Sequence, residues 1–234
     1  MTPAAGTAGG VLTAYVDVKS PYAYLALDPT RKLARDCGVT LDWLPLTLNI
    51  PDYLGSARLD ADGRVIEQDR TAHQWRKVKY AYMDVRRHAN LRGLTIRGTQ
   101  KIWDSSIASI AMLYAREQDP AIVDRFLDLA FPPFWRRELD IEDASVISGL
   151  LAEAGADTAG FAAWLAGPGR AMHDSLRAEA EQAGVFGVPF YRWQDEGFWG
   201  REQLPLVRYR ITGELPANAA DLGMAPVDSG GAAG

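Results

Sequence analysis

The stretch Val11-Leu-Thr-Ala-Tyr-Val-Asp17-Val-Lys-Ser20-Pro21-Tyr22 decides the fold of this chain. Residues 11–18 form an apolar run that predicts a buried strand. Ser20 and Pro21 then suit the start of a helix, with serine at the N-cap and proline in the first helical position. The sequence therefore predicts a strand, a sharp turn and a helix whose first N–H groups surround the Ser20 hydroxyl, an environment that favours anions.

The next forty residues extend this start into a β-α-β unit. A helical pattern covers residues 21–37, with a break expected near Pro29 because proline removes a backbone hydrogen bond there. Gly38 ends the helix. Residues 39–44 alternate as a second strand, which we expect to pair in parallel with the first through a right-handed crossover.

Helices are predicted to dominate the middle of the chain. After an irregular region at residues 47–70, which includes a turn at Asp60-Ala-Asp-Gly63, an amphipathic helix is expected over 72–91. Turn chemistry is enough to account for the two aspartates, because no carboxylate stands where the last ligand of a calcium loop would be. Further helical patterns cover residues 104–118, 120–130, 142–154, 158–166 and 170–183.

Strands return only near the C-terminal end. Residues 188–193 and 197–199 indicate a hairpin, and a last helix is expected over 201–212. The order is β-α-β, a helical block, then α-β-β-α. This order is that of an α/β protein with a thioredoxin-like fold interrupted by an inserted all-helical domain.

The element order also predicts how the chain divides. We expect the thioredoxin-like domain to be made of two separate segments, with the insert between them and a flexible tail at each end. The segments are 11–70 and 184–213 for the thioredoxin-like domain, 71–183 for the insert, and 1–10 and 214–234 for the tails.

Composition narrows the function classes. The chain has 234 residues and a net charge of −5, with no basic cluster, which argues against a nucleic-acid-binding surface. Cys37 is the one cysteine, so no internal disulfide can form, as in a reducing compartment. The N-terminus does not read as a signal peptide, and no apolar run reaches the roughly 20 residues of a membrane span. We therefore expect a cytoplasmic protein with no membrane partner.

Ser20 is the first candidate for chemistry. A thioredoxin-like oxidoreductase would carry a Cys-x-x-Cys pair at this turn, and here Ser20 and Ala23 stand at the two cysteine positions. This excludes disulfide chemistry by the protein itself. A hydroxyl at a helix start can instead hold a thiolate that belongs to a bound molecule. Serine before proline is also an ordinary N-cap pair, so the motif alone allows a purely structural role.

Two further candidates lie near the C-terminal strands. In Gly184-Val-Phe-Gly-Val188-Pro189 the proline enters a strand. It is a candidate for a cis peptide that leaves the preceding backbone free to pair with an extended ligand, although an edge-strand turn would read the same way. In Phe198-Trp-Gly200-Arg201-Glu202 a strand ends and a helix begins. Backbone N–H groups, a cation and an anion there can bind a charged amino-acid head group.

Four stretches in combination carry a resemblance to one family. They are Ser20-Pro-Tyr-x-Tyr-Leu-Ala26, Gly184-Val-Phe-Gly-Val-Pro189, Phe198-Trp-Gly-x-x-x-Leu204 and, in the insert, Tyr82-Met-Asp-Val-Arg-Arg-His-Ala89. The chain resembles the 2-hydroxychromene-2-carboxylate isomerases, which are similar to kappa-class glutathione transferases and belong to the DsbA-like thioredoxin superfamily. The resemblance covers residues 11–212.

The resemblance implies a glutathione-dependent isomerase. It implies that the cysteine backbone of glutathione pairs with Val188 before a cis Pro189, and that the sulfur lies near Ser20. Gly200, Arg201 and Glu202 would then hold the γ-glutamyl end. Physics supports the role of Ser20, because a hydroxyl donor and a helix N-terminus both favour thiolate over thiol. The substrate would be a small conjugated, aromatic-derived acid, and the protein a homodimer.

Alternatives remain open at this stage. A kappa-like transferase that conjugates a thiol to an electrophile would carry the same motifs. A non-catalytic thiol- or peptide-binding protein would be favoured if the bulky Phe190 filled the thiol site. Another low-molecular-weight thiol could replace glutathione, because residues 49–55 lack the lysine expected of the isomerases.

The remaining candidates are weaker. The three histidines share no ligand spacing, so no metal site is expected. Cys37 is expected to be half-buried and inert. Four aromatic residues could line a substrate pocket, although core packing is expected for at least half of them. These are Tyr22, Tyr24, Trp103 and Trp135.

Overall fold

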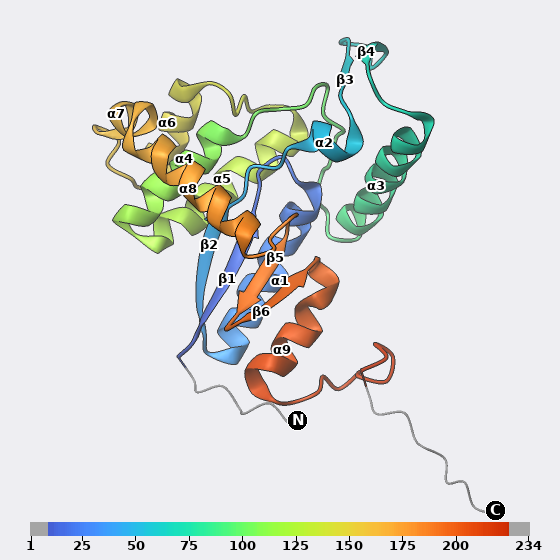
Figure 1. The fold of residues 1–234 in the computed structure, drawn as a ribbon, viewed down its shortest axis with the longest axis vertical. Coiled ribbons are helices and arrows are strands. Elements are labelled where there is room, and N and C mark those ends of the chain that lie inside the picture. The colour runs from blue at the N-terminus through green and yellow to red at the C-terminus, as the bar shows by residue number, and fades with distance from the viewer. Residues whose placement is uncertain (1–8, 225–234) are drawn as a thin grey trace, which may run out of the picture.

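A four-stranded sheet lies at the centre of the computed structural model, which describes residues 9–224 (Figure 1). The strand order is β2-β1-β5-β6. β1 (Val11–Val16) pairs in parallel with β2 (Thr40–Pro45), as predicted. β5 (Phe190–Trp193) runs antiparallel to β1 and forms the predicted hairpin with β6 (Glu196–Trp199). This mixed sheet confirms the thioredoxin-like α/β fold.

Two helices from opposite ends of the chain pack together beside this sheet. α1 (Pro21–Cys37) connects the parallel strands and contacts α9 (Leu204–Thr212), which also packs on β5. A short 3₁₀ turn, η1 (Arg201–Gln203), precedes α9, so the predicted last helix begins as 3₁₀. The N-terminal and C-terminal thioredoxin-like segments therefore build one unit around β1 and β5.

The insert is helical, as predicted, and it falls into two parts in Figure 1. One part is a group of helices beside β2, and the other is the long α3, which stands apart from them. Within residues 9–224, none of the helices combines the length and hydropathy that crossing a bilayer requires. The helices are α3 (Ala72–Leu91), α4 (Ser106–Gln118), α5 (Pro120–Arg136), α6 (Ala144–Glu153), α7 (Phe161–Ala166) and α8 (Pro168–Gln182).

The helix group is attached to the sheet by polar contacts as well as by the core. Arg116 on α4 donates from Nε and Nη2 to the two carboxylate oxygens of Asp42 on β2, at 2.8 and 3.0 Å. Arg31 on α1 donates from Nε to Asp124 on α5 at 2.9 Å. A bidentate contact between arginine and a carboxylate fixes orientation as well as distance. The Arg116–Asp42 pair therefore helps to orient α4 on β2.

The predicted break of α1 near Pro29 is wrong. The helix runs unbroken from Pro21 to Cys37. Proline at position 29 leaves the Leu25 carbonyl without its usual N–H partner four residues on. Arg92, just after α3, supplies the missing donor: its Nη1 lies 2.6 Å from the Leu25 oxygen. A long-range contact thus replaces the local hydrogen bond, and α1 continues through the proline.

The expectation of an irregular region at residues 47–70 is also wrong in part. The segment contains a short helix, α2 (Ile50–Leu54), and a hairpin of β3 (Ala57–Leu59) and β4 (Val65–Gln68). The predicted turn joins these strands, with Asp60 Oδ1 accepting from the Arg64 N–H at 2.8 Å. These strands are too short and too polar to show strand periodicity in the sequence.

Other boundaries shift by a few residues. α5 was expected to end at 130 but continues to Arg136 through Pro132 and Pro133. The division into 11–70, 71–183 and 184–213 stays a prediction. Of the two predicted flexible tails, residues 1–8 and 225–234 lie outside the described part of the chain.

Candidate active site

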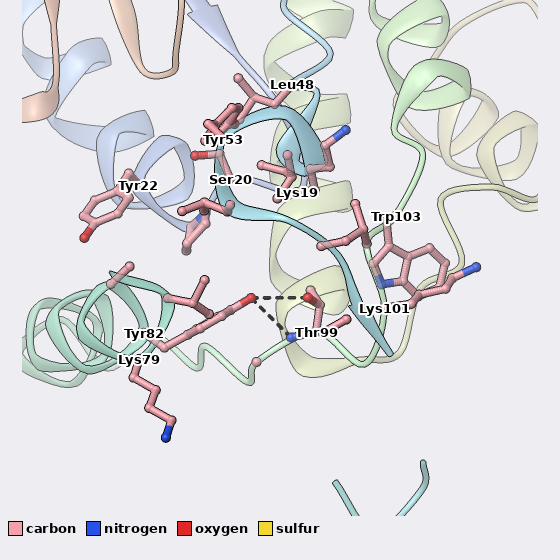
Figure 2. A pocket seen from close by; sticks show the side chains of 18 of the residues that line it. Lys19, Ser20, Tyr22, Leu48, Tyr53, Lys79, Tyr82, Thr99, Lys101 and Trp103 are labelled. Atoms are coloured by element: carbon pink, nitrogen blue, oxygen red, sulfur yellow. Dashed lines mark hydrogen bonds between the residues drawn. The ribbon is translucent and has the colours of Figure 1, made fainter. Parts of the chain in front are cut away.

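A cavity of about 830 Å³ lies between the start of α1 and one face of α3 (Figure 2). The predicted thioredoxin-like half contributes Ser20, Tyr53 and Val188 to its lining, and the insert contributes Tyr82 and Trp103. Figure 2 shows Ser20 and Tyr53 on one side and Tyr82 and Thr99 on the other. The volume is in the range of small-molecule sites in proteins.

Ser20 occupies the N-cap of α1, as predicted. Its Oγ accepts from the Ala23 N–H at 3.2 Å, and its N–H donates to the Asp17 carbonyl at 2.8 Å. The hydroxyl proton is left to donate, and Ser20, which is 5% exposed as a residue, lines the cavity. Pro21 has no N–H, and the first-turn N–H of Tyr22 has no partner within the helix. An anion above this turn would therefore meet a hydroxyl donor and the positive end of α1.

The peptide between Val188 and Pro189 is cis, as the sequence suggested. Val188 lines the cavity. Within residues 9–224 neither its N–H nor its carbonyl takes part in a backbone hydrogen bond, because the ladder of β5 begins only at Phe190. Both groups are thus available to an extended ligand. Pro189 itself is not among the lining residues; its carbonyl accepts from the Gly200 N–H at 2.9 Å.

Phe190 does not fill the thiol site. It is 5% exposed, it packs edge-on against Phe186, and it lies beside Gly197 rather than in the cavity wall. Phe186 and Trp199 form an exposed aromatic rim next to Val188, with ring centroids 5.0 Å apart. A non-catalytic binding protein was favoured only if Phe190 filled the thiol site. The position of Phe190 in the described chain therefore does not favour that alternative.

The structure does not bring Gly200, Arg201 and Glu202 into the same cavity. Glu202 folds back over Gly200, where a side chain would collide with its carboxylate. Arg201 lines a separate shallow depression that also includes Asp28 and Arg92. The short turn η1, which carries Glu202, nevertheless contacts α1. A ligand head group that reached these residues would have to extend beyond the cavity.

The aromatic candidates divide as expected. Tyr22 and Trp103 line the cavity, whereas Tyr24 stacks on Phe131 in the core and Trp135 is fully buried. The Tyr22 hydroxyl donates to Asp84 on α3 at 3.2 Å and so joins α1 to the insert. Burial, followed by the nearby Asp84 carboxylate, raises the pKa of Tyr22 to about 12. Tyr22 therefore stays protonated at neutral pH.

Sequence reasoning missed the contribution of α3. Trp75, Val78, Tyr82 and Arg86 line the cavity from one face of this helix. Their spacing of three and four residues was visible in the sequence and marks one helical face. The Tyr82 hydroxyl lies 3.2 Å from Thr99 Oγ1, which fixes the ring across from Ser20.

The surroundings of the weaker candidates, Cys37 and the histidines, explain them without a catalytic role. Burial raises the pKa of the Cys37 thiol, so the thiol is less reactive than a free cysteine. His173 is buried, with Nε2 2.9 Å from Thr47 Oγ1 and Nδ1 3.0 Å from Asp174. In the part of the chain that the structure describes, no three histidine, cysteine, aspartate or glutamate side chains are grouped so that they could hold a metal ion.

The fold and this site define the class of the protein. It is a thioredoxin-like protein with a helical insert, which carries Ser20 and Ala23 at the positions of the two redox cysteines. The DsbA-like thioredoxin domain family matches residues 11–212, and the chain belongs to this family.

Two relatives of known name are similar over most of their length. The 2-hydroxychromene-2-carboxylate isomerase of Sphingobium xenophagum is 29% identical over 192 residues, which cover 81% of this chain and 92% of that protein. The protein of the same name from Pseudomonas putida is 26% identical over 210 residues, which cover 89% and 97%.

Solved structures show the same fold. A 2-hydroxychromene-2-carboxylate isomerase has a TM-score of 0.64 at 24% identity, with 91% of this chain and 98% of that chain covered. The cytosolic disulfide reductase DsbM from Pseudomonas aeruginosa, solved with GSH, has a TM-score of 0.55 at 20% identity, with 86% and 92% covered. At these identities the likeness concerns the fold alone.

Proposed function

We propose that this chain is a glutathione-dependent isomerase of the 2-hydroxychromene-2-carboxylate type, acting on a conjugated, aromatic-derived acid. One observation carries the proposal: the Ser20 hydroxyl at the start of α1 and the unbonded backbone of Val188 line the same cavity. A cysteine-containing peptide that pairs with Val188 would bring its sulfur toward Ser20. The two isomerases similar to this chain support the reaction class. The DsbM structure with GSH supports the thiol.

The chain's own residues would bind and stabilise an anion. Glutathione held between Ser20 and Val188 would supply a thiolate nucleophile for reversible addition to a conjugated carbonyl compound. Ser20 would donate its O–H to the sulfur, and the unbonded N–H of Tyr22 at the positive end of α1 would favour the negative charge of the sulfur. The rings of Tyr82 and Trp103 form part of the wall and reduce the access of water to the substrate.

Arg201 and Glu202, which the resemblance places at the γ-glutamyl end, lie outside the cavity that Ser20 lines. We propose that Glu202 still receives the α-ammonium group of the γ-glutamyl end, which would have to extend beyond the cavity to reach it. We further propose a homodimer in the cytoplasm. Light scattering of the purified protein tests the homodimer, because a monomer at micromolar concentration would contradict it.

The function is tested by turnover. Isomerisation of 2-hydroxychromene-2-carboxylate is followed by ultraviolet absorbance with and without glutathione, in the wild type and in Ser20→Ala. Asp119→Ala is the matched control, since Asp119 also caps a helix that begins with proline and accepts from the Ala121 N–H at 2.8 Å. Glutathione-dependent turnover that Ser20→Ala lowers and Asp119→Ala keeps supports the proposal. Turnover without glutathione, or a stable glutathione conjugate as product, contradicts it, and the conjugate would identify a transferase.

A further inference from the structure

The charge of the cavity lining differs from that of the whole chain. The protein has 30 acidic and 25 basic residues. Among the described residues, six lysines and arginines line the cavity and no aspartate or glutamate does. An acidic protein therefore lines this cavity with positive charge. The six are Lys19, Arg70, Lys79, Arg86, Lys101 and Arg137.

Two of the six are held by acidic partners, and a third points away from the other side chains of the site. Lys19 forms an ion pair with the buried Asp17 at 3.4 Å and donates to Ser105 at 3.0 Å. Lys101 forms an ion pair with Glu142 and lies over the ring of Trp103. Lys79 points away from the other labelled side chains in Figure 2.

The other three cations are arginines held in the same way. Each donates from Nε to a backbone carbonyl: Arg70 to Gly55 at 3.3 Å, Arg86 to Ile96 at 3.1 Å and Arg137 to Gly98 at 2.7 Å. Within residues 9–224 none of the three has an acidic partner within ion-pair distance. Their terminal nitrogens keep the paired donors that match a carboxylate.

Arg86 and Arg137 converge on one residue. A Cβ atom added to Gly98 would lie 3.3 Å from Arg86 Nη2, and the carbonyl of Gly98 is the acceptor of Arg137 Nε. Two positive side chains from α3 and from the end of α5 thus meet around a residue without a side chain. Their repulsion is not offset by any ion pair of their own, and a bound anion would offset it.

An aromatic group accompanies this pair of arginines. The Arg86 guanidinium lies 5.5 Å from the centroid of the Tyr82 ring, which faces the cavity opposite Ser20. The ring is fixed through the hydrogen bond of its hydroxyl to Thr99. A planar ligand beside Tyr82 would have its substituents close to Arg86.

We propose that Arg86 and Arg137 form the carboxylate subsite of the substrate, so that the cavity selects a planar aromatic acid whose carboxylate lies at Gly98. The inference rests on the proposed function and adds the residues that choose the substrate. Arg86 and Arg137 are specificity residues in this account, whereas Ser20 acts on the thiol.

Binding of chromone-2-carboxylate, measured by calorimetry without glutathione, tests this subsite. The matched neutral probe is chromone-2-carboxamide. We expect the acid to bind about tenfold or more tightly than the amide, because hydrogen bonds to charged groups contribute about 1.5–3 kcal/mol. Arg86→Gln and Arg137→Gln should each remove that preference. Arg76→Gln, an exposed arginine on α3 that does not line the cavity, should keep it.

Two results would overturn the subsite. One is a failure of the acid preference to depend on the arginines: the wild type binds acid and amide equally, or the preference survives in both arginine variants. The other concerns the source of the carboxylate: if Arg86→Gln weakens glutathione as much as esterifying its glycine does, the pair holds the tripeptide instead. Since the chromone assay needs neither glutathione nor turnover, a failure of the proposed isomerisation leaves its result readable on its own.

Discussion

Replacing Arg92 by methionine should destabilise the fold through a helix that Arg92 does not belong to. Arg92 Nη1 donates to the Leu25 carbonyl, which Pro29 leaves without a backbone donor. A hydrogen bond from a charged donor contributes about 1.5–3 kcal/mol. The ion pair of Arg92 with Asp28 adds less than about 1 kcal/mol, because Asp28 is 71% exposed. We therefore expect a loss of about 2–3 kcal/mol, or roughly 4–12 °C in Tm.

The proline makes this prediction specific. In a Pro29→Ala background the new N–H can bond the Leu25 carbonyl, so Arg92→Met should cost only the exposed ion pair. The effect of Pro29→Ala on the unfolded chain cancels, because it is present in both backgrounds. A double-mutant cycle should thus give a coupling of about 1.5–3 kcal/mol, the contribution of the hydrogen bond alone.

Urea unfolding of the four proteins measures the coupling. Arg35→Met serves as a control, since Arg35 is an exposed residue of α1 with no ion pair among the described residues, and it should change stability by less than about 0.5 kcal/mol. An Arg92→Met cost that is the same with proline and with alanine at position 29 would refute the reasoning.

Three other predictions concern the start of α1. Ser20→Ala should lower the free energy of unfolding by about 0.5–2 kcal/mol through loss of the N-cap, measured by urea unfolding; an unchanged value would contradict the cap. Ser20→Cys should give a thiol with a pKa below the ordinary value of about 8.5, seen as alkylation faster than that of Cys37 at neutral pH; equal rates would contradict the effect of the helix end. The unfolded chain ionises tyrosine near pH 10, whereas burial, followed by Asp84, holds the pKa of Tyr22 at about 12. Folded protein thus keeps a proton that unfolded protein loses, so stability should fall as pH rises from 10 to 12, and Tyr22→Phe should flatten that fall in urea unfolding at pH 9 and 11.

Local chemistry made the start of the chain predictable. Ser20, Pro21 and Gly38 determine where α1 begins and ends through backbone geometry within a few residues, and the structure follows them. The cis peptide before Pro189 could be anticipated for the same reason, since it depends on a proline at the entry of a strand.

Contacts distant in sequence explain where the prediction was wrong. Pro29 does not break α1 because Arg92 donates the hydrogen bond that the Leu25 carbonyl lacks. No local pattern in the sequence predicts that partner. The short β3 is tied through the Leu59 N–H to the Gln100 carbonyl at 2.7 Å, a contact across about forty residues that three strand residues cannot reveal.

The candidate site shows the same division. The site residues of the thioredoxin-like half were found from local motifs. Ser20 precedes Pro21 at the start of a helix, and Val188 precedes Pro189 at the entry of a strand. The cavity lining from the insert was not found in this way, since Arg86 on α3 and Arg137 at the end of α5 come together at Gly98 only in the folded chain. The spacing of Tyr82 and Arg86 on α3 was the one local signal of that wall.

The central claim is that Ser20 and the start of α1 stabilise a thiolate supplied by bound glutathione. The most direct measurement is an ultraviolet titration of the thiolate of bound glutathione in the wild type and in Ser20→Ala. We predict that the wild type lowers the thiol pKa of bound glutathione by about one unit or more, roughly 1.4 kcal/mol, and that the variant binds glutathione without this shift. The same thiol pKa in both proteins, or no binding of glutathione by the wild type, would contradict the account.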